Sequence, residues 1–117
     1  MNDCIFCKII KGEIPSKKYY EDELMIIIAD IDPKAKLHYL AIPKKHYKLL
    51  SEMTAADAAD LGKCLMKISE LAPSLGLENG YRLIVNQGDD AIQTVPHLHI
   101  HLLGGQKLVL RDFRTDV

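Results

Sequence analysis

Three histidines alternate with apolar residues in the stretch Val95-Pro-His-Leu-His-Ile-His-Leu-Leu-Gly-Gly105. Successive side chains of a β-strand point to opposite faces of its sheet. A strand over His97–Leu103 therefore carries His97, His99 and His101 on one face and the intervening leucine and isoleucine residues on the other. The pattern predicts a sheet with chemistry on one side and a hydrophobic core on the other.

The rest of the chain predicts an α+β fold. A short N-terminal helix is expected to end by Pro15, and apolar residues at helical spacing predict one long helix that begins at Thr54, with Asp57 completing a capping-box-like start, and ends near Pro73. Aromatic and β-branched runs predict strands at Lys18–Tyr20, Leu24–Ile28, Leu37–Ile42, Gly80–Asn86 and His97–Leu103. The first two strands should form a hairpin, and we expect an antiparallel sheet with the long helix packed on one face.

Length and charge narrow the possible partners. A chain of 117 residues suits a single domain over residues 1–117, because little apolar material remains for a second core. The formal net charge of −1 gives no general attraction to nucleic acid or to a membrane surface, so neither is expected as a partner. No apolar run reaches the ~18 residues that cross a bilayer, and the first residues lack the layout of a signal peptide, so a cytoplasmic location is expected.

The three histidines could be polar residues of a half-exposed strand, metal ligands or catalytic groups. Same-face positions lie ~7 Å apart, so three of them do not converge easily on one ion with bonds of ~2 Å. A cupin-like or non-haem iron site would need a carboxylate soon afterwards, but no Glu follows Glu78 and no Asp lies between Asp90 and Asp112. A neutral imidazole can attack phosphorus without a metal, because neighbouring donors stabilise charge on the phosphate oxygens. The pattern therefore favours a histidine nucleophile that acts on a phosphate.

The stretch His97-Leu-His-Ile-His-Leu-Leu103 resembles the signature of the histidine triad (HIT) superfamily. Similarity to its Hint-type branch extends over nearly the whole chain except the tail from Lys107 to Val117, and covers Cys4–Pro15, Asp30–Pro33, His38–His46 and Gly80–Asn86. The resemblance implies a hydrolase or transferase that acts on purine nucleoside 5′-monophosphoramidates or related AMP conjugates. The reaction would pass through a covalent nucleotidyl-histidine and would need no cofactor for its chemistry.

The resemblance also implies roles for individual residues. His99 would be the nucleophile, His101 would contact the phosphate and the leaving group, and His38 would line the site. A purine nucleotide would be held by Asp30 at the ribose, by Asn86, Gln93, Thr94 and His101 near the phosphate or leaving group, and by Ile5, Phe6, Ile28 and Leu40 around the base. A carboxylate suits two ribose hydroxyls because it accepts two hydrogen bonds at once. The four apolar residues could equally be ordinary core packing.

Cys4 and Cys7 form a Cys-x-x-Cys pair near the start of the chain. A thioredoxin-like site would need a strand leading into the turn, and only three residues precede Cys4. Two thiolates and two imidazoles make a tetrahedral zinc set, and His46 and His97 are the histidines left once the other three are given to catalysis. The resemblance supports this quartet, so we expect a structural Zn²⁺ on it, with a reduced or partly core cysteine pair as the alternative. Cys64 in the long helix is expected to be a small buried hydrophobe.

Two departures from the family pattern concern the leaving group. Ala91-Ile92 stands where relatives often have Gly-Gly before the Gln93-Thr94 pair, and the Trp-Pro-Pro ending of close relatives is absent. The resemblance further implies a homodimer. Two alternatives keep the same site: cleavage of dinucleoside polyphosphates, and a nucleotide-binding scaffold with weak activity. The intact triad favours the enzyme.

Overall fold

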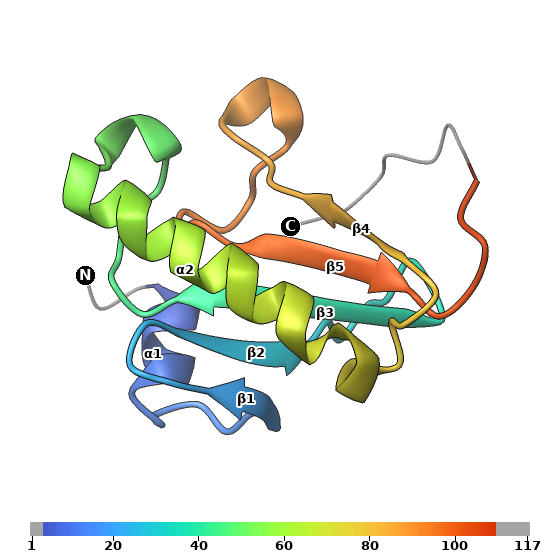
Figure 1. Ribbon diagram of the computed structural model, residues 1–117. Helices are drawn as coiled ribbons and strands as arrows, with labels where there is room; N and C mark the ends of the chain where they lie inside the picture. Colours follow the sequence, from blue (N-terminus) through green and yellow to red (C-terminus); the bar gives the residue numbers. More distant parts are fainter. Residues whose placement is uncertain (1–3, 110–117) are drawn as a thin grey trace.

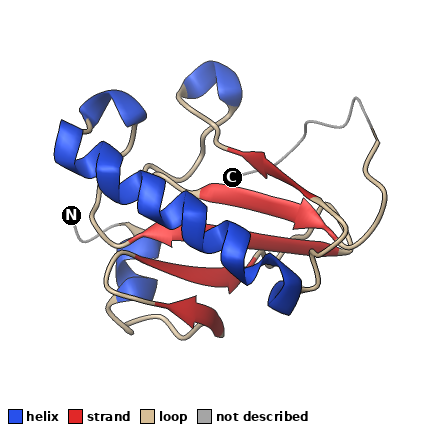
Figure 2. Cartoon of the chain, viewed as in Figure 1, coloured by secondary structure: helices blue, strands red, loops and turns tan. Residues whose placement is uncertain are grey.

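Five antiparallel strands form one sheet in the computed structural model, which describes residues 4–109. The strands are β1 (Lys18–Glu21), β2 (Met25–Ala29), β3 (Leu37–Pro43), β4 (Tyr81–Ile84) and β5 (Ile100–Gly104). The helices are α1 (Ile5–Ile10), α2 (Ala55–Leu71) and the short 3₁₀ helices η1 (Leu50–Glu52), η2 (Ala72–Leu75) and η3 (Asp89–Ala91). The strand order is β1-β2-β3-β5-β4 (Figure 1). The predicted α+β fold, with one long helix and a short N-terminal helix, is confirmed (Figure 2).

The long helix α2 lies across one face of the sheet (Figure 1). It begins with the predicted capping box: Thr54 Oγ1 accepts a hydrogen bond from the Asp57 N–H at 3.2 Å, and the Thr54 N–H donates to the Asp57 carboxylate at 3.0 Å. Cys64 is 4% exposed in the core beneath α2, as expected for a small hydrophobe. The chain turns away after η2 at Gly76, where φ is +80° and an added Cβ would lie 2.9 Å from Leu37. Glycine is therefore required at this turn.

The short helix α1 packs on the opposite face, against β2 and β3. Phe6 and Ile9 of α1 are buried with Ile26, Leu40 and Ile42 of the sheet. Leu40 pairs in register with the histidine at position 101 of β5, so the triad side of the sheet is also the α1 side. The core cluster around α1 and the triad histidines thus share this face of the sheet.

The triad strand begins later than predicted. β5 starts at Ile100, so His97 and His99 precede the ladder, and the prediction of one strand from His97 is wrong in this respect. The backbone N–H of Leu98 donates instead to the Tyr47 carbonyl at 2.7 Å, which ties the segment to a loop. The predicted alternation of side chains is confirmed, since His97 and His99 contact α1 whereas Ile100 belongs to the core under α2. The expectation that the core lies only on the face away from the histidines is wrong, because a second core cluster seats α1 on the triad face.

The last two expectations about chain segments concern β4 and the C-terminal tail. The strand expected over 80–86 is shorter, because β4 ends at Ile84 and the chain then enters a loop. The tail without similarity to the family begins at Lys107, and most of it, residues 110–117, lies outside the described residues. None of the helices formed within residues 4–109 has the length and apolar character needed to span a membrane.

Candidate active site

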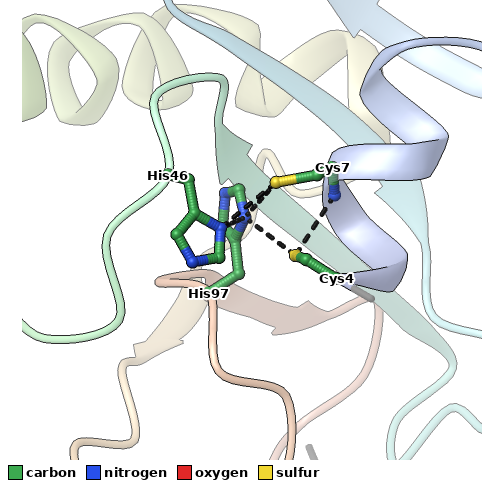
Figure 3. Close-up of side chains that lie close together, drawn as sticks. All are labelled: Cys4, Cys7, His46 and His97. Atoms are coloured by element: carbon green, nitrogen blue, oxygen red, sulfur yellow. Dashed lines mark hydrogen bonds between the residues drawn. The ribbon is translucent and has the colours of Figure 1, made fainter. Parts of the chain in front are cut away.

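Two thiols and two imidazoles, groups that can ligate a metal ion, meet where α1, the loop after β3 and the segment before β5 come together (Figure 3). Their ligand atoms, from Cys4, Cys7, His46 and His97, all lie within 4.8 Å of one another. His97 Nδ1 is 3.3 Å from Cys4 Sγ and 3.5 Å from Cys7 Sγ. His46 Nδ1 is 3.1 Å from Cys7 Sγ and 3.1 Å from His97 Nδ1. The structure thus brings the predicted quartet together from segments up to 93 positions apart.

The distances within this cluster fit the tetrahedral coordination of one metal ion. Bonds of ~2.0 Å to nitrogen and ~2.3 Å to sulfur place neighbouring ligand atoms roughly 3.3–3.8 Å apart at tetrahedral angles, close to the observed separations. The far nitrogen of His97, Nε2, lies 2.8 Å from the Pro43 carbonyl and therefore donates to it. A metal-bound histidine ordinarily makes such a bond, because it fixes the ring and its tautomer. The lone pair of His97 is then on Nδ1, facing the other three ligands.

The protonation states of the cluster describe its metal-free form. Burial lowers the pKa of the His97 imidazole to about 4, so this ring is neutral near neutral pH and can ligate. Burial, with the adjoining Cys4, raises the pKa of the Cys7 thiol to about 11. An ion must therefore displace a proton from Cys7 to bind, and its affinity should rise with pH.

His99 has a defined tautomer. Its Nδ1 lies 2.7 Å from the His97 carbonyl oxygen, which can only accept, so Nδ1 carries the proton. In the neutral ring the lone pair is therefore on Nε2, the nitrogen that can attack an electrophile. The ring is 2% exposed and Phe6 packs edge-on against it, with ring centroids 5.0 Å apart. The lone pair of neutral His99 is thus confined to one nitrogen, Nε2.

His38 and His101 form a second hydrogen-bonded unit. The backbone N–H of Lys34 donates to His38 Nδ1 at 3.0 Å, so the proton of neutral His38 is on Nε2. That Nε2 lies 2.9 Å from His101 Nδ1, which therefore accepts. The proton of neutral His101 is consequently on Nε2, where it can be donated to a phosphate oxygen or a leaving group. The rings of His99 and His101 are neighbours, with centroids 5.1 Å apart.

The polar residues expected to bind the nucleotide differ in how close they lie to the His38–His101 pair. Asp30 follows β2, with Oδ2 3.4 Å from His38 Nε2 and Oδ1 accepting from the Asp32 N–H at 2.8 Å. Asn86 follows β4 and is half-buried, whereas Thr94 is exposed in the segment that leads to the triad. The structure therefore brings Asp30 to the histidines directly and places Asn86 and Thr94 on the connecting loop.

The four apolar residues expected around the base are not equivalent. Phe6, Ile28 and Leu40 are 4–5% exposed within the core that seats α1 on the sheet. Ile5 on the same helix is 47% exposed. Ile5 thus presents apolar surface to solvent, while the other three contribute mainly to packing.

Two glutamines of the loop between β4 and β5 form hydrogen bonds to Lys48, just before η1, and to Leu50, the first residue of η1. Gln93 Oε1 accepts from the Gly88 N–H at 2.9 Å and Gln93 Nε2 donates to the Lys48 carbonyl at 2.9 Å. Gln87 Oε1 accepts from the Leu50 N–H at 2.7 Å. Gln93 is 8% exposed, so the residue expected near the phosphate or leaving group holds its own loop in place in this structure.

Ile92 in the same loop adopts a left-handed backbone conformation. Its φ is +60°, a region that costs a β-branched residue ~1–2 kcal/mol, and its side chain is 64% exposed. Ile92→Gly should raise the free energy of unfolding by about 1 kcal/mol, because relief of strain exceeds the added entropy of the unfolded chain. Urea unfolding measures this change. Ala91→Gly, in η3, is the matched control, and an equal gain there would contradict the explanation.

The sequence did not reveal the backbone partners that set the tautomers. The carbonyls of Pro43 and His97 and the N–H of Lys34 belong to residues without a chemical signature, and their roles depend on strand register. A cavity of about 660 Å³ lies at the other end of β4 and β5, beside Arg82 and Lys107. None of the five histidines lines this cavity, so its walls do not offer the imidazole chemistry of the triad.

Comparison with known proteins agrees with this geometry. The HIT domain model matches residues 11–108. An uncharacterised HIT-like protein of Synechocystis is 47% identical over 104 residues, which cover 89% of this chain and 91% of the relative. A HIT family hydrolase from Clostridium thermocellum is 48% identical with a TM-score of 0.87, covering 93% and 96% of the two chains. A histidine triad nucleotide-binding protein from Candida albicans is 40% identical with a TM-score of 0.76, covering 85% of this chain and 72% of that one.

Proposed function

Because this chain belongs to the HIT domain family, we propose that it hydrolyses purine nucleoside 5′-monophosphoramidates or related AMP conjugates. The observation that carries the proposal is the tautomer of His99: Nδ1–H donates to the His97 carbonyl, so the lone pair is on Nε2. His101 Nε2–H beside it supplies a donor for the charge that develops on phosphate oxygens. A nucleophile and a neighbouring donor are the groups that phosphoryl attack needs.

The reaction would proceed in two displacements at the α-phosphorus. In the first, His99 Nε2 forms a bond to phosphorus while the bond from phosphorus to the leaving nitrogen breaks, and the amine departs with that electron pair and takes up a proton from solvent. In the second, water attacks phosphorus and gives up a proton to solvent while the bond to Nε2 breaks, which releases the nucleoside monophosphate and restores neutral His99. Asp30 would hold the ribose hydroxyls, because it is the carboxylate that lies beside the His38–His101 unit.

A substrate panel tests this proposal. Purified protein would be incubated with adenosine and guanosine phosphoramidates, aminoacyl adenylates and dinucleoside polyphosphates, and the products and acid-quenched protein would be analysed by mass spectrometry. We expect fastest turnover of the phosphoramidates and one nucleotidyl group on His99. Faster cleavage of dinucleoside polyphosphates would instead indicate the other hydrolase activity, and binding of AMP without turnover of any conjugate would indicate a scaffold.

We also propose that Cys4, Cys7, His46 and His97 hold a structural Zn²⁺. The support is the chemistry of the set, two thiols and two imidazoles at tetrahedral spacing, and the hydrogen bond from His97 to Pro43. The ion would join the N-terminal segment to the triad segment and would supply folding free energy rather than a reaction step. A cytoplasmic location fits this proposal, since a reducing compartment keeps both cysteines available as ligands.

Activity should fall on the acid side of neutrality. Burial lowers the pKa of His38 below its ordinary value, with Asp30 opposing the shift. Just below about pH 6.5, His38 binds a proton more readily in the unfolded chain than in the folded one, so the free energy of unfolding decreases as the pH falls. Protonation of folded His38 at lower pH then breaks the hydrogen bond that its Nδ1 accepts from Lys34. Single-turnover rates should be constant from about pH 8 to about pH 6.5 and decline below. An acid limb centred above pH 7 would contradict the neutral His38.

We propose further that the protein is a homodimer formed through β4 and α2. β4 is an edge strand, and its Leu83 is 41% exposed on the α2 side of the sheet, where Leu65 and Met66 of α2 are 40% and 65% exposed. Two such edges can pair about a twofold axis and bury these side chains. Leu83→Lys should convert the dimer to a monomer in sedimentation measurements. Ile31→Ser, at a fully exposed isoleucine elsewhere, is the control and should leave the mass unchanged.

A further inference from the structure

We infer that the Cys4–Cys7–His46–His97 cluster positions the nucleophile, and that Phe6 is the positioning residue that links the two. The inference rests on the proposed role of His99, and it assigns the cluster a task beyond stabilising the fold. Two contacts connect the cluster to His99: the carbonyl of His97 and the ring of Phe6.

The first contact is through the backbone of His97. Its Nδ1 lies in the cluster, its Nε2–H donates to the Pro43 carbonyl at 2.8 Å, and its backbone N–H donates to the Val95 carbonyl at 2.8 Å. Because both the ring and the backbone N–H of His97 are hydrogen-bonded, the orientation of its carbonyl group is fixed. That carbonyl accepts the proton of His99 Nδ1 at 2.7 Å. Whatever fixes the His97 ring therefore fixes the acceptor that sets the tautomer of His99.

The second contact is through Phe6, which lies between the two cysteines in sequence and is 5% exposed. Its ring meets the His97 ring at 78° with centroids 5.9 Å apart, and the His99 ring at 76° with centroids 5.0 Å apart. Both are edge-to-face arrangements, which are favourable between aromatic rings. The Phe6 ring thus packs against the ring of His99, and its helix α1 contains Cys7 and begins at Cys4.

The two contacts make a common prediction about His99. When the four ligands share an ion, α1 and His97 are held together, and His99 keeps its Nδ1–H tautomer with the lone pair on Nε2. Without the ion, the helix and the His97 carbonyl can move, and His99 can also adopt the Nε2–H tautomer, which places the lone pair on the wrong nitrogen. Displacement of a reacting group by as little as ~1 Å can cost up to ~10²-fold in rate.

The test compares zinc-loaded Phe6→Leu with zinc-loaded Ile9→Val. Ile9 belongs to the same helix and core cluster and is 7% exposed, so its truncation loosens the packing of α1 without removing the Phe6 ring. Ring ¹⁵N chemical shifts of His99 would be recorded at about pH 8, where neutral histidine dominates, together with kcat, KM and zinc content. A third sample is the wild-type protein stripped of zinc by a chelator and kept cold.

We expect Phe6→Leu to retain about one zinc per chain while the two ¹⁵N shifts of His99 move toward each other, the mark of mixed tautomers. Its kcat should fall about tenfold with little change in KM, since orientation of the nucleophile is what is lost. Ile9→Val should match the wild type in both shifts and rate. The stripped wild type should show the same mixing of shifts, and it decides the question if Phe6→Leu fails to fold.

Two results would overturn the inference. One is a single Nδ1–H tautomer in zinc-loaded Phe6→Leu and in the stripped protein. The other is equal mixing in Ile9→Val, which would reduce the effect to general loosening of α1. Because the ¹⁵N shifts do not depend on turnover, they test the positioning even where the substrate panel detects no hydrolysis, so the failure of the proposed function would be recognised separately.

Discussion

Replacing His99 with alanine is expected to lower kcat by at least ~10³-fold while binding of AMP persists. The reason lies in the hydrogen bonds of the site. His99 is the triad histidine whose Nδ1–H is fixed by a backbone carbonyl and whose Nε2 has the lone pair. His101 cannot replace it, because its Nδ1 accepts from His38 and its Nε2 carries the proton. No nucleotidyl group should then accumulate on the protein.

The measurement combines single-turnover kinetics with titration calorimetry of AMP and mass spectrometry of acid-quenched protein. The control is His101→Ala, which removes the neighbouring imidazole but leaves the nucleophile. It should slow the reaction while a nucleotidyl adduct on His99 can still be trapped. Hydrolysis by His99→Ala at a near-native rate, or an adduct that survives in that variant, would exclude His99 as the nucleophile.

Much of the fold could be predicted because the local signals agree with one another. The capping box at Thr54 and Asp57 formed as its spacing predicts. The apolar residues at helical spacing predicted α2, and the β-branched runs predicted strands whose limits lie within three residues of the observed ones. The alternation of histidine with leucine and isoleucine separated the two faces correctly, because side-chain period in an extended chain does not depend on whether a neighbour is hydrogen-bonded.

The start of the triad strand was mispredicted because pairing is a tertiary property. His97 and His99 have extended-chain periodicity, yet the backbone of this segment bonds to the loop at Tyr47 and to Val95 instead of a strand. The segment has to reach the cysteines of α1, so His97 leaves the sheet. Residue types along one segment contain no information about which loop will lie beside it.

Roles that depend on distant backbone atoms were similarly hidden. The role of Gln93 near the phosphate stays a prediction, and the sequence did not indicate that its amide also holds the loop to Lys48. The role of Phe6 beside the base likewise stays a prediction, and the sequence did not indicate that its ring packs on those of His97 and His99. In contrast, the Cys/His quartet could be assembled from residue counts, since thiols and imidazoles are few and their chemistry is specific.

Replacing Cys4 with serine is expected to abolish stoichiometric zinc binding and to lower the melting temperature by on the order of 15 °C. A ligand that binds only the folded state stabilises it by about 4 kcal/mol when its free concentration is 1,000-fold above its Kd. Loss of one thiolate removes most of this free energy. The residual thiol of Cys7 then lies beside His46 without its partner, and burial, the largest cause of its raised pKa, still favours the protonated thiol.

Cys64→Ser is the matched control, because Cys64 is also buried but belongs to α2 and to the core on the other face of the sheet, away from the quartet. It should retain about one zinc per chain, measured by elemental analysis of protein purified without chelator. Added zinc should raise the melting temperature of the stripped wild type and of Cys64→Ser but not of Cys4→Ser. Turnover of Cys4→Ser in the cold should fall about tenfold, far less than for His99→Ala, because the cluster orients the nucleophile but takes no part in bond formation. Equal zinc content in Cys4→Ser and Cys64→Ser would show that the four side chains do not hold the metal.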